Sequence, residues 1–68
     1  MDNVIIVNIH ECSRHPGVIY AELHKTDGEL CISATLEYIF AALKDPDRGY
    51  LCINAFRDGF GNFHINDA

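Results

Sequence analysis

The chain has 68 residues, with ten Asp and Glu against five Lys and Arg, and a net charge of −5 at pH 7. That length leaves room for one domain, residues 1–68, and for few walls around a deep substrate pocket. The apolar fraction of 49% is too high for a disordered chain. We therefore expect a small folded domain that is not an enzyme and needs no cofactor.

The start of the chain and its cysteines indicate where the protein works. Asp2 precedes the apolar run over residues 4–9, and neither Lys nor Arg does, so we expect no signal peptide. No stretch approaches the ~20 apolar residues of a membrane span. Three widely spaced cysteines predict free thiols in a reducing compartment. The sequence therefore predicts a cytoplasmic protein that does not bind membranes.

The first half of the chain predicts three strands. Residues 3–11 form a β-branched run that begins with apolar residues on both faces, as in a central strand. After a Pro-Gly loop, residues 18–25 alternate as a half-buried strand does. Asp27-Gly28 predicts a tight hairpin with positive φ at both central positions, and residues 30–33 form the partner strand. The residues expected to face the core from these two hairpin strands are Ile19, Ala21, Leu23, Leu30 and Ile32.

The second half predicts one helix and two more strands. The helix is capped by Ser33 or Thr35 and stopped by Pro46. A strand follows over residues 50–56, and residues 62–65 form a short edge strand. The core-facing stripe of the helix, at positions i, i+3, i+4 and i+7, is Leu36, Ile39, Phe40 and Leu43. The residues expected to point inward from the strand after the helix are Leu51, Ile53 and Ala55.

The elements follow the order β-β-β-α-β-β. Such an order predicts an α+β fold, in which a small antiparallel sheet of four to five strands carries the helix on one face.

A cluster of potential metal ligands lies near the end of the first strand. His10, Cys12 and His15 fall within six positions and are residue types that bind transition metals. Further ligands would have to come from His24, Cys31 or Cys52. Paired spacings typical of zinc sites are lacking, so we expect no metal. The same residues could form a Cys–His pair, but the chain has few cations to stabilise a thiolate.

The basic residues are too few and too scattered for direct nucleic-acid binding. Binding to phosphates needs several Lys or Arg on one face. The chain has five, most of them next to carboxylates: Arg14, Lys25, Lys44, Arg48 and Arg57. We expect no direct contact with nucleic acid.

Acidic residues are the strongest candidates for a binding surface. They fall at predicted turns, on the polar face of a strand and on the polar side of the helix, and they are Glu22, Asp27, Glu29, Glu37, Asp45, Asp47 and Asp58. Such charges either keep the protein soluble or bind a basic partner and speed encounter with it. The partner on the second interpretation is a larger protein or ribonucleoprotein complex with a basic surface.

In size, acidity and α+β character, and in the seven acidic positions above, the chain resembles the small anti-CRISPR inhibitors of phages and mobile elements. The resemblance implies an inhibitor in the cytoplasm of a bacterial host that binds a CRISPR effector complex and blocks target DNA binding. The acidic residues would then occupy the site of DNA phosphates, a form of DNA mimicry. An inhibitor of this kind can also bind through an apolar patch.

An alternative function uses the apolar face of the sheet and is unrelated to CRISPR. We expect the face opposite the helix to be partly apolar, and such a patch typically marks an interface. This would make the protein a dimerisation or docking module, present as a monomer or a homodimer. The residues expected on that face are Val4, Ile6, His10, Tyr20, His24, Phe56 and His64.

Overall fold

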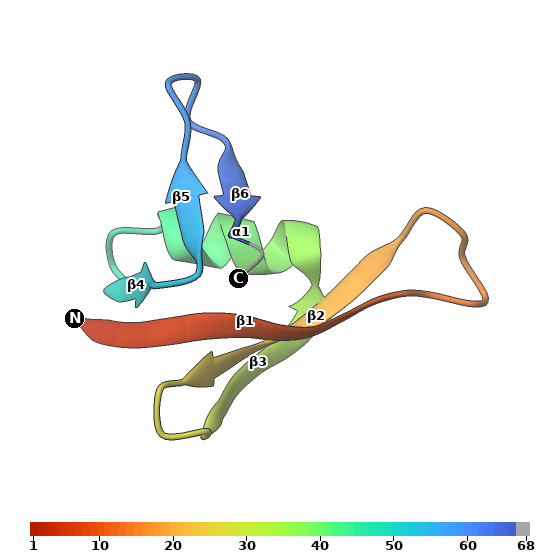
Figure 1. Cartoon of the computed structure of the whole chain (residues 1–68), viewed down its shortest axis with the longest axis horizontal. Helices are drawn as coiled ribbons and strands as arrows, with labels where there is room; N and C mark the ends of the chain where they lie inside the picture. The colour runs from red at the N-terminus through yellow and green to blue at the C-terminus, as the bar shows by residue number, and fades with distance from the viewer. Residues whose placement is uncertain (67–68) are drawn as a thin grey trace.

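The computed structural model describes residues 1–66, which form one helix and six strands. The α+β class is confirmed, with a four-stranded and a two-stranded sheet. In chain order the elements are β1 (Asp2–Glu11), β2 (Ile19–Lys25), β3 (Leu30–Thr35), α1 (Leu36–Lys44), β4 (Tyr50–Cys52), β5 (Ala55–Arg57) and β6 (Phe63–Ile65) (Figure 1).

The larger sheet has the strand order β3-β2-β1-β4, so β1 is a central strand, as predicted. β1 and β2 are antiparallel, as are β2 and β3, whereas β4 runs parallel to β1. The sheet is therefore mixed, where the sequence predicts an antiparallel one. The difference arises because α1 carries the chain from β3 across β2 and β1, and a crossover of this kind joins parallel strands.

The core lies between α1 and one face of this sheet. Ala21 and Leu23 of β2 are buried, which confirms the alternation predicted for that strand. The helical stripe is also confirmed, since Ile39 and Leu43 are buried and Leu36 and Phe40 pack against them partly buried. The full set of buried apolar residues is Val4, Ile6, Ala21, Leu23, Ile39, Ala42 and Leu43.

The prediction of which β1 side chains face away from the helix is wrong, because it is shifted by one position along the strand. Val4 and Ile6 are buried beneath α1, where we expected them on the opposite face. Side chains alternate along a strand, so Ile5 and Val7 lie on the face away from the helix. Because all four residues are β-branched and apolar, the sequence carried no signal for which pair faces α1.

β1 changes register at Asn8, which has a left-handed φ of 55°. Val7 pairs with Glu22 and His10 with Tyr20, so two residues of β1 oppose one of β2. An extra residue in the left-handed conformation forms a β-bulge, which bends and twists the strand. Beyond this bulge, β1 and β2 extend as a two-stranded arm away from the helix (Figure 1).

The turn between β2 and β3 is one residue longer than predicted. Gly28 has a positive φ of 97°, and Asp27 does not share it. The Lys25 N–H donates to Glu29 O, and the Gly28 N–H donates to Lys25 O. A three-residue loop with glycine in the left-handed position produces this pattern.

The strand predicted over residues 50–56 is two strands, which belong to different sheets. β4 ends at Cys52, and β5 begins at Ala55 after a turn over residues 53 and 54. At this turn the Asn54 side chain receives the Ile6 N–H at Oδ1 (3.0 Å) and donates from Nδ2 to Ile6 O (2.7 Å). Of the three residues expected to point inward, Leu51 and Ile53 are half exposed and Ala55 is partly buried, while Tyr50 and Cys52 pack against the core.

The β5–β6 hairpin is attached to α1 through Phe63. The Phe63 ring stacks on Phe40, with ring centroids 5.6 Å apart. Lys44 and Arg57 both lie over the Phe63 ring, at 5.7 and 4.9 Å from its centroid. The far end of the hairpin stands clear of the rest of the molecule (Figure 1).

Candidate functional site

Four of the seven predicted acidic residues come together at one end of the larger sheet. Asp27 and Glu29 lie at the β2–β3 turn, and Asp45 and Asp47 lie between α1 and β4. Both loops flank the start of β1, because its first residues pair with the end of β2 and with the start of β4 (Figure 1). Asp2 lies at this start and adds a fifth carboxylate. We call the group the acidic end: Asp2, Asp27, Glu29, Asp45 and Asp47.

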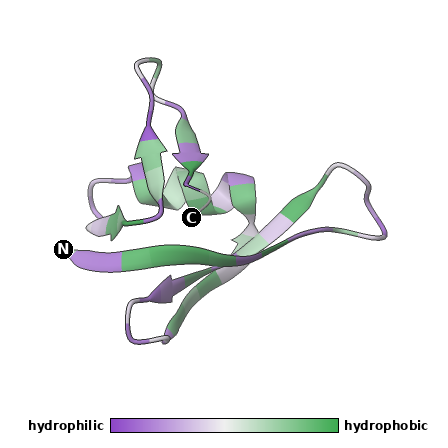
Figure 2. Ribbon diagram, viewed as in Figure 1, coloured by the Kyte–Doolittle hydropathy of each residue, from purple (hydrophilic) through white to green (hydrophobic). Residues whose placement is uncertain are grey.

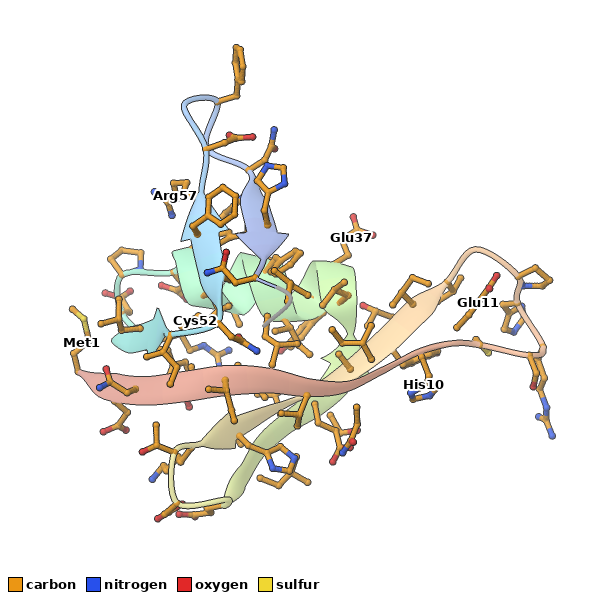
Figure 3. The ribbon with its side chains drawn as sticks, viewed as in Figure 1. Met1, His10, Glu11, Glu37, Cys52 and Arg57 are labelled. Atoms are coloured by element: carbon orange, nitrogen blue, oxygen red, sulfur yellow. The ribbon has the colours of Figure 1, made fainter. Side chains whose placement is uncertain are left out.

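The other three predicted acidic residues lie elsewhere. Glu22 lies in the middle of β2, and Asp58 lies between β5 and β6. Glu37 is in the first turn of α1 and projects on the side of the helix away from β1 (Figure 3). The seven residues therefore do not form one continuous surface.

Three of the loop carboxylates hold their own turns. Asp27, Asp45 and Asp58 each accept, at Oδ1, the backbone N–H two residues further on, at 2.9 to 3.0 Å. Aspartate favours turns for this reason, because its short side chain replaces a backbone acceptor. Each of these residues therefore has a structural role in its turn, which is separate from any role in binding.

Cations partly offset the acidic end. Lys25 Nζ lies 3.5 Å from Glu29 Oε2, and Arg48 Nε lies 3.8 Å from Asp45 Oδ2. The negative charge of Glu29, and after it that of Asp2, raises the pKa of Lys25 above its ordinary value. Exposed pairs of this kind contribute little to stability, so the residues remain available to a partner.

The sheet face away from α1 is partly apolar. Leu30 of β3, His24 of β2 and Ile5 of β1 pair across the sheet, and Leu51 of β4 pairs with Asn3. Leu30 and Leu51 are 51% and 52% exposed. We call this surface the outer sheet face, and its residues are Ile5, Val7, Tyr20, Glu22, His24, Leu30 and Leu51. Figure 2 shows the apolar stretch of β1 that crosses it.

One charged cluster lies within the outer sheet face. Asn8 Nδ2 donates to Glu22 Oε2 at 2.6 Å, and His24 Nε2 lies 3.1 Å from Glu22 Oε1. The hydrogen bond from Asn8, followed by that from His24, lowers the pKa of Glu22 below its ordinary value. The outer sheet face therefore holds a fixed negative charge at neutral pH.

The sequence prediction missed the apolar members of this surface. Leu30 was expected to face the core, but β3 shifts register between its pairings with Leu23 and His24, and this turns Leu30 outward. Leu51 was also expected inward. His10, Tyr20 and His24 were placed on the correct sheet, whereas Phe56 and His64 lie in the β5–β6 hairpin, with their rings stacked at 5.1 Å.

The predicted His and Cys residues do not assemble a metal site. Within residues 1–66, no three His, Cys, Asp or Glu side chains are placed to hold a metal ion together. His10 and Cys12 line a shallow hollow on the arm with Arg14 and Tyr20, and the His10 ring stacks on Tyr20 at 6.0 Å.

Cys52 is the last residue of β4 and pairs with Val4 of β1 (Figure 3). Its Sγ donates to Asn54 Oδ1 at 3.1 Å. Burial raises the pKa of the Cys52 thiol, which disfavours the thiolate at this position.

No protein-family model, curated protein or solved structure matches the chain. No helix formed by residues 1–66 is long and apolar enough to cross a membrane.

Proposed function

We propose that the protein acts without catalysis, by binding a larger protein or ribonucleoprotein complex that presents a basic surface. One observation supports this function: the acidic end and the half-exposed Leu30 and Leu51 lie at the same end of the sheet. Leu30 directly follows Glu29, and Leu51 pairs with Asn3, the neighbour of Asp2. A surface that combines these groups suits a partner with both cationic and apolar side chains.

The two kinds of group have different roles in such an encounter. The carboxylates attract a basic partner over a distance and raise the association rate, an effect that salt weakens. The apolar residues contribute once water leaves the contact, and salt does not screen that contribution. Binding that depends on both is fast, selective for basic surfaces and partly sensitive to salt.

The resemblance to anti-CRISPR inhibitors suggests a particular partner, a CRISPR effector complex. Such a complex holds its target DNA in a positively charged channel. In this proposal the acidic end enters that channel, in place of the DNA phosphates, and prevents target binding. Asp27, Glu29, Asp45 and Asp47 are the members of the predicted set that would make this contact together.

A second candidate function relies on the outer sheet face alone. Leu30 and Leu51 of this face are each about half exposed, which favours an apolar docking surface. In this case the protein is a small interaction module, and its partner need not be basic.

A capture experiment distinguishes these functions. Tagged protein is mixed with bacterial lysate that contains CRISPR effector complexes, at about 0.1 and about 0.5 M salt, which shortens the Debye length from about 10 Å to about 4 Å. Bound proteins are identified by mass spectrometry. Capture of an effector at low salt and its loss at high salt is the result expected for the inhibitor.

Paired variants assign the surface. Glu29→Gln with Asp47→Asn removes two carboxylates that do not close turns, and Glu37→Gln is the control at a distant acidic position. Leu51→Ser tests the apolar part, and Tyr38→Ser is its control, because Tyr38 on α1 is equally exposed at 52%. Capture that survives both test changes would contradict the proposed surface. Loss with Leu51→Ser alone would favour the second candidate.

A further inference from the structure

β3 forms one margin of the larger sheet, and within residues 1–66 no strand pairs with its far side (Figure 1). A strand in this position presents backbone N–H and C=O groups to which a further strand can bind. Proteins usually protect such an edge with charged residues, with proline or by keeping the strand very short. β3 has six residues, Leu30–Thr35, and none of them is charged or a proline. Its edge is therefore open to a further strand.

The opposite margin of the sheet is protected. β4 has only three residues, Tyr50–Cys52. Directly after it, the Ile53 N–H donates to Val4 O at 2.9 Å. The Asn54 side chain then occupies both backbone groups of Ile6. The sheet thus has one margin that is short and closed by its own chain, and one that is long and uncovered.

The backbone of Ser33 points toward the open side of β3. Hydrogen bonds to one neighbour alternate along an antiparallel strand. The Lys25 N–H donates to Glu29 O, so Leu23, two residues before Lys25, bonds to its own partner in β3, which is Ile32. Ser33 follows Ile32 and therefore directs its N–H and C=O away from β2. A strand beside β3 would receive one hydrogen bond from Ser33 and return another.

The two faces of β3 determine which side chains suit an added strand. Ile32 pairs with the buried Leu23, on the face that α1 covers. Apolar β-branched residues suit the positions beside it. Ser33 pairs with Glu22 on the outer sheet face, where polar residues suit the neighbouring positions. Because side chains alternate along a strand, the occupant that fits has alternating apolar and polar residues.

The charges at the two ends of β3 disfavour a second copy of the chain as that occupant. Glu29 lies four residues before Ser33, and Glu37 lies four residues after it. Antiparallel pairing of two β3 strands about Ser33 would bring Glu29 of each copy near Glu37 of the other, and like charges repel. Lys25 lies 3.5 Å from Glu29, but Asp27 is in the same turn, so this end keeps a net negative charge. Cations at both ends of the occupant would instead lie near carboxylates.

We propose that β3 binds an extended segment of a partner protein, which adds to the larger sheet as a fifth strand. The segment has alternating apolar and polar residues and a Lys or Arg at each end. In this mode of recognition the main-chain hydrogen bonds provide affinity and the side chains provide selectivity. The inference rests on the proposed function in one respect, that the partner is basic, and it adds the conformation in which the partner is bound.

A synthetic peptide tests the edge directly. The probe is Lys-Thr-Val-Thr-Val-Thr-Lys with blocked ends, titrated into isotope-labelled protein up to about 1 mM. NMR signals of residues 30–35 should shift, and at saturation the hydrogen exchange of the Ser33 amide should slow at least about tenfold. The same peptide with N-methyl groups on its three Thr residues keeps its charge but lacks three backbone donors. It should bind at least about tenfold more weakly.

Variants of the protein assign the contact to the edge and its charges. Ser33→Pro removes the central donor, and proline is tolerated in an edge strand where the N–H faces solvent. It should weaken peptide binding at least about tenfold, whereas Ser33→Thr keeps the N–H and should bind like the wild type. Glu29→Gln with Glu37→Gln should weaken binding of this peptide and leave unchanged that of a peptide with Ser at both ends. NMR spectra verify that each variant is folded.

No binding up to about 1 mM, or equal binding of the N-methylated peptide, would overturn the proposal. Self-association of the wild type that Ser33→Pro abolishes would place a second copy on the edge, and so would contradict the choice of occupant. The capture experiment above is a separate readout. Failure to capture an effector contradicts the proposed inhibitor alone, whereas capture that Ser33→Pro leaves unchanged contradicts strand addition alone.

Discussion

The side-chain amide of Asn54 pairs with both backbone groups of Ile6, 48 residues away in the chain. The amide thus replaces a residue of a neighbouring strand at the point where β4 has ended. Ile6 is buried, so its N–H and C=O would otherwise lack partners in a place that water reaches poorly. The Asn54 side chain therefore satisfies this edge of β1, and the backbone continues from Asn54 into the β5–β6 hairpin.

Replacing Asn54 should therefore destabilise the fold strongly. Asn54→Ala leaves two backbone groups without partners, and we expect the free energy of unfolding to fall by about 2 to 4 kcal/mol. Asn54→Asp should lower the free energy of unfolding by a similar amount, since a carboxylate accepts from Ile6 N–H but repels Ile6 O. Urea denaturation measures both, with Asn62→Ala in the exposed hairpin turn as the control. A loss below about 0.5 kcal/mol, typical of surface changes, would contradict this role.

The bulge at Asn8 makes a second prediction. Asn8→Gly keeps the left-handed backbone, whereas a β-branched residue is strained there, so Asn8→Val should be at least about 1 to 2 kcal/mol less stable than Asn8→Gly. Both variants remove the hydrogen bond to Glu22, and the pKa of Glu22 should therefore rise toward its ordinary value. NMR titration of the Glu22 carboxyl measures the second effect. An unchanged pKa would show that His24 alone maintains the shift.

Asp58 predicts a specific dependence of stability on pH. The hydrogen bond from His64, together with two backbone N–H groups, lowers the pKa of Asp58 from 3.8 to about 2. The unfolded chain therefore takes up the proton first as the pH falls. The stabilisation is complete above the unfolded pKa and disappears as the pH falls from about 4 to about 2.

Asp58→Asn isolates this contribution, since an asparagine oxygen still accepts the turn N–H groups. We expect a lower urea midpoint than the wild type at pH 6 and no difference near pH 2. A difference that stays constant across this range would contradict the assignment to the carboxylate.

The start of α1 provides a fourth prediction. Thr35 Oγ1 accepts the Tyr38 N–H at 3.2 Å, which identifies Thr35 as the helix cap. Thr35→Ala should lower the free energy of unfolding by about 1 kcal/mol, and Thr35→Ser should preserve most of it. Ser33→Ala is the matched control, because Ser33 was the other predicted cap and lies exposed in β3. Equal losses at the two positions would contradict the assignment.

The sequence predicted those parts of the fold that depend on local periodicity. The alternation of β2 and the helical stripe of α1 each have one apolar face, so Leu23 and Ile39 were placed correctly. Residues 4–7 have two apolar faces, and only the position of α1 decides between them. The sequence also could not predict the end of β4, because the amide of Asn54 acts on a residue at the other end of the chain.

The candidate site, too, could be predicted only in those parts that depend on local sequence. The carboxylates could be found from their positions in predicted turns, and four of the seven lie at one end of the larger sheet. Their association with Leu30 and Leu51 depended on a register shift in β3 and on the parallel pairing of β4 with β1. Neither feature has a local sequence signal.

The parallel pairing of β1 with β4 also affects how the chain folds. β1 is synthesised before β2, but its second neighbour, β4, arrives only after β2, β3 and α1. Contacts so distant in sequence form slowly, so an incomplete chain holds β1 with one open, apolar edge. We expect fragments that end at residue 49 to aggregate through this edge and those that extend past Asn54 to remain dispersed. We therefore expect nascent chains to aggregate most readily just before β4 emerges from the ribosome.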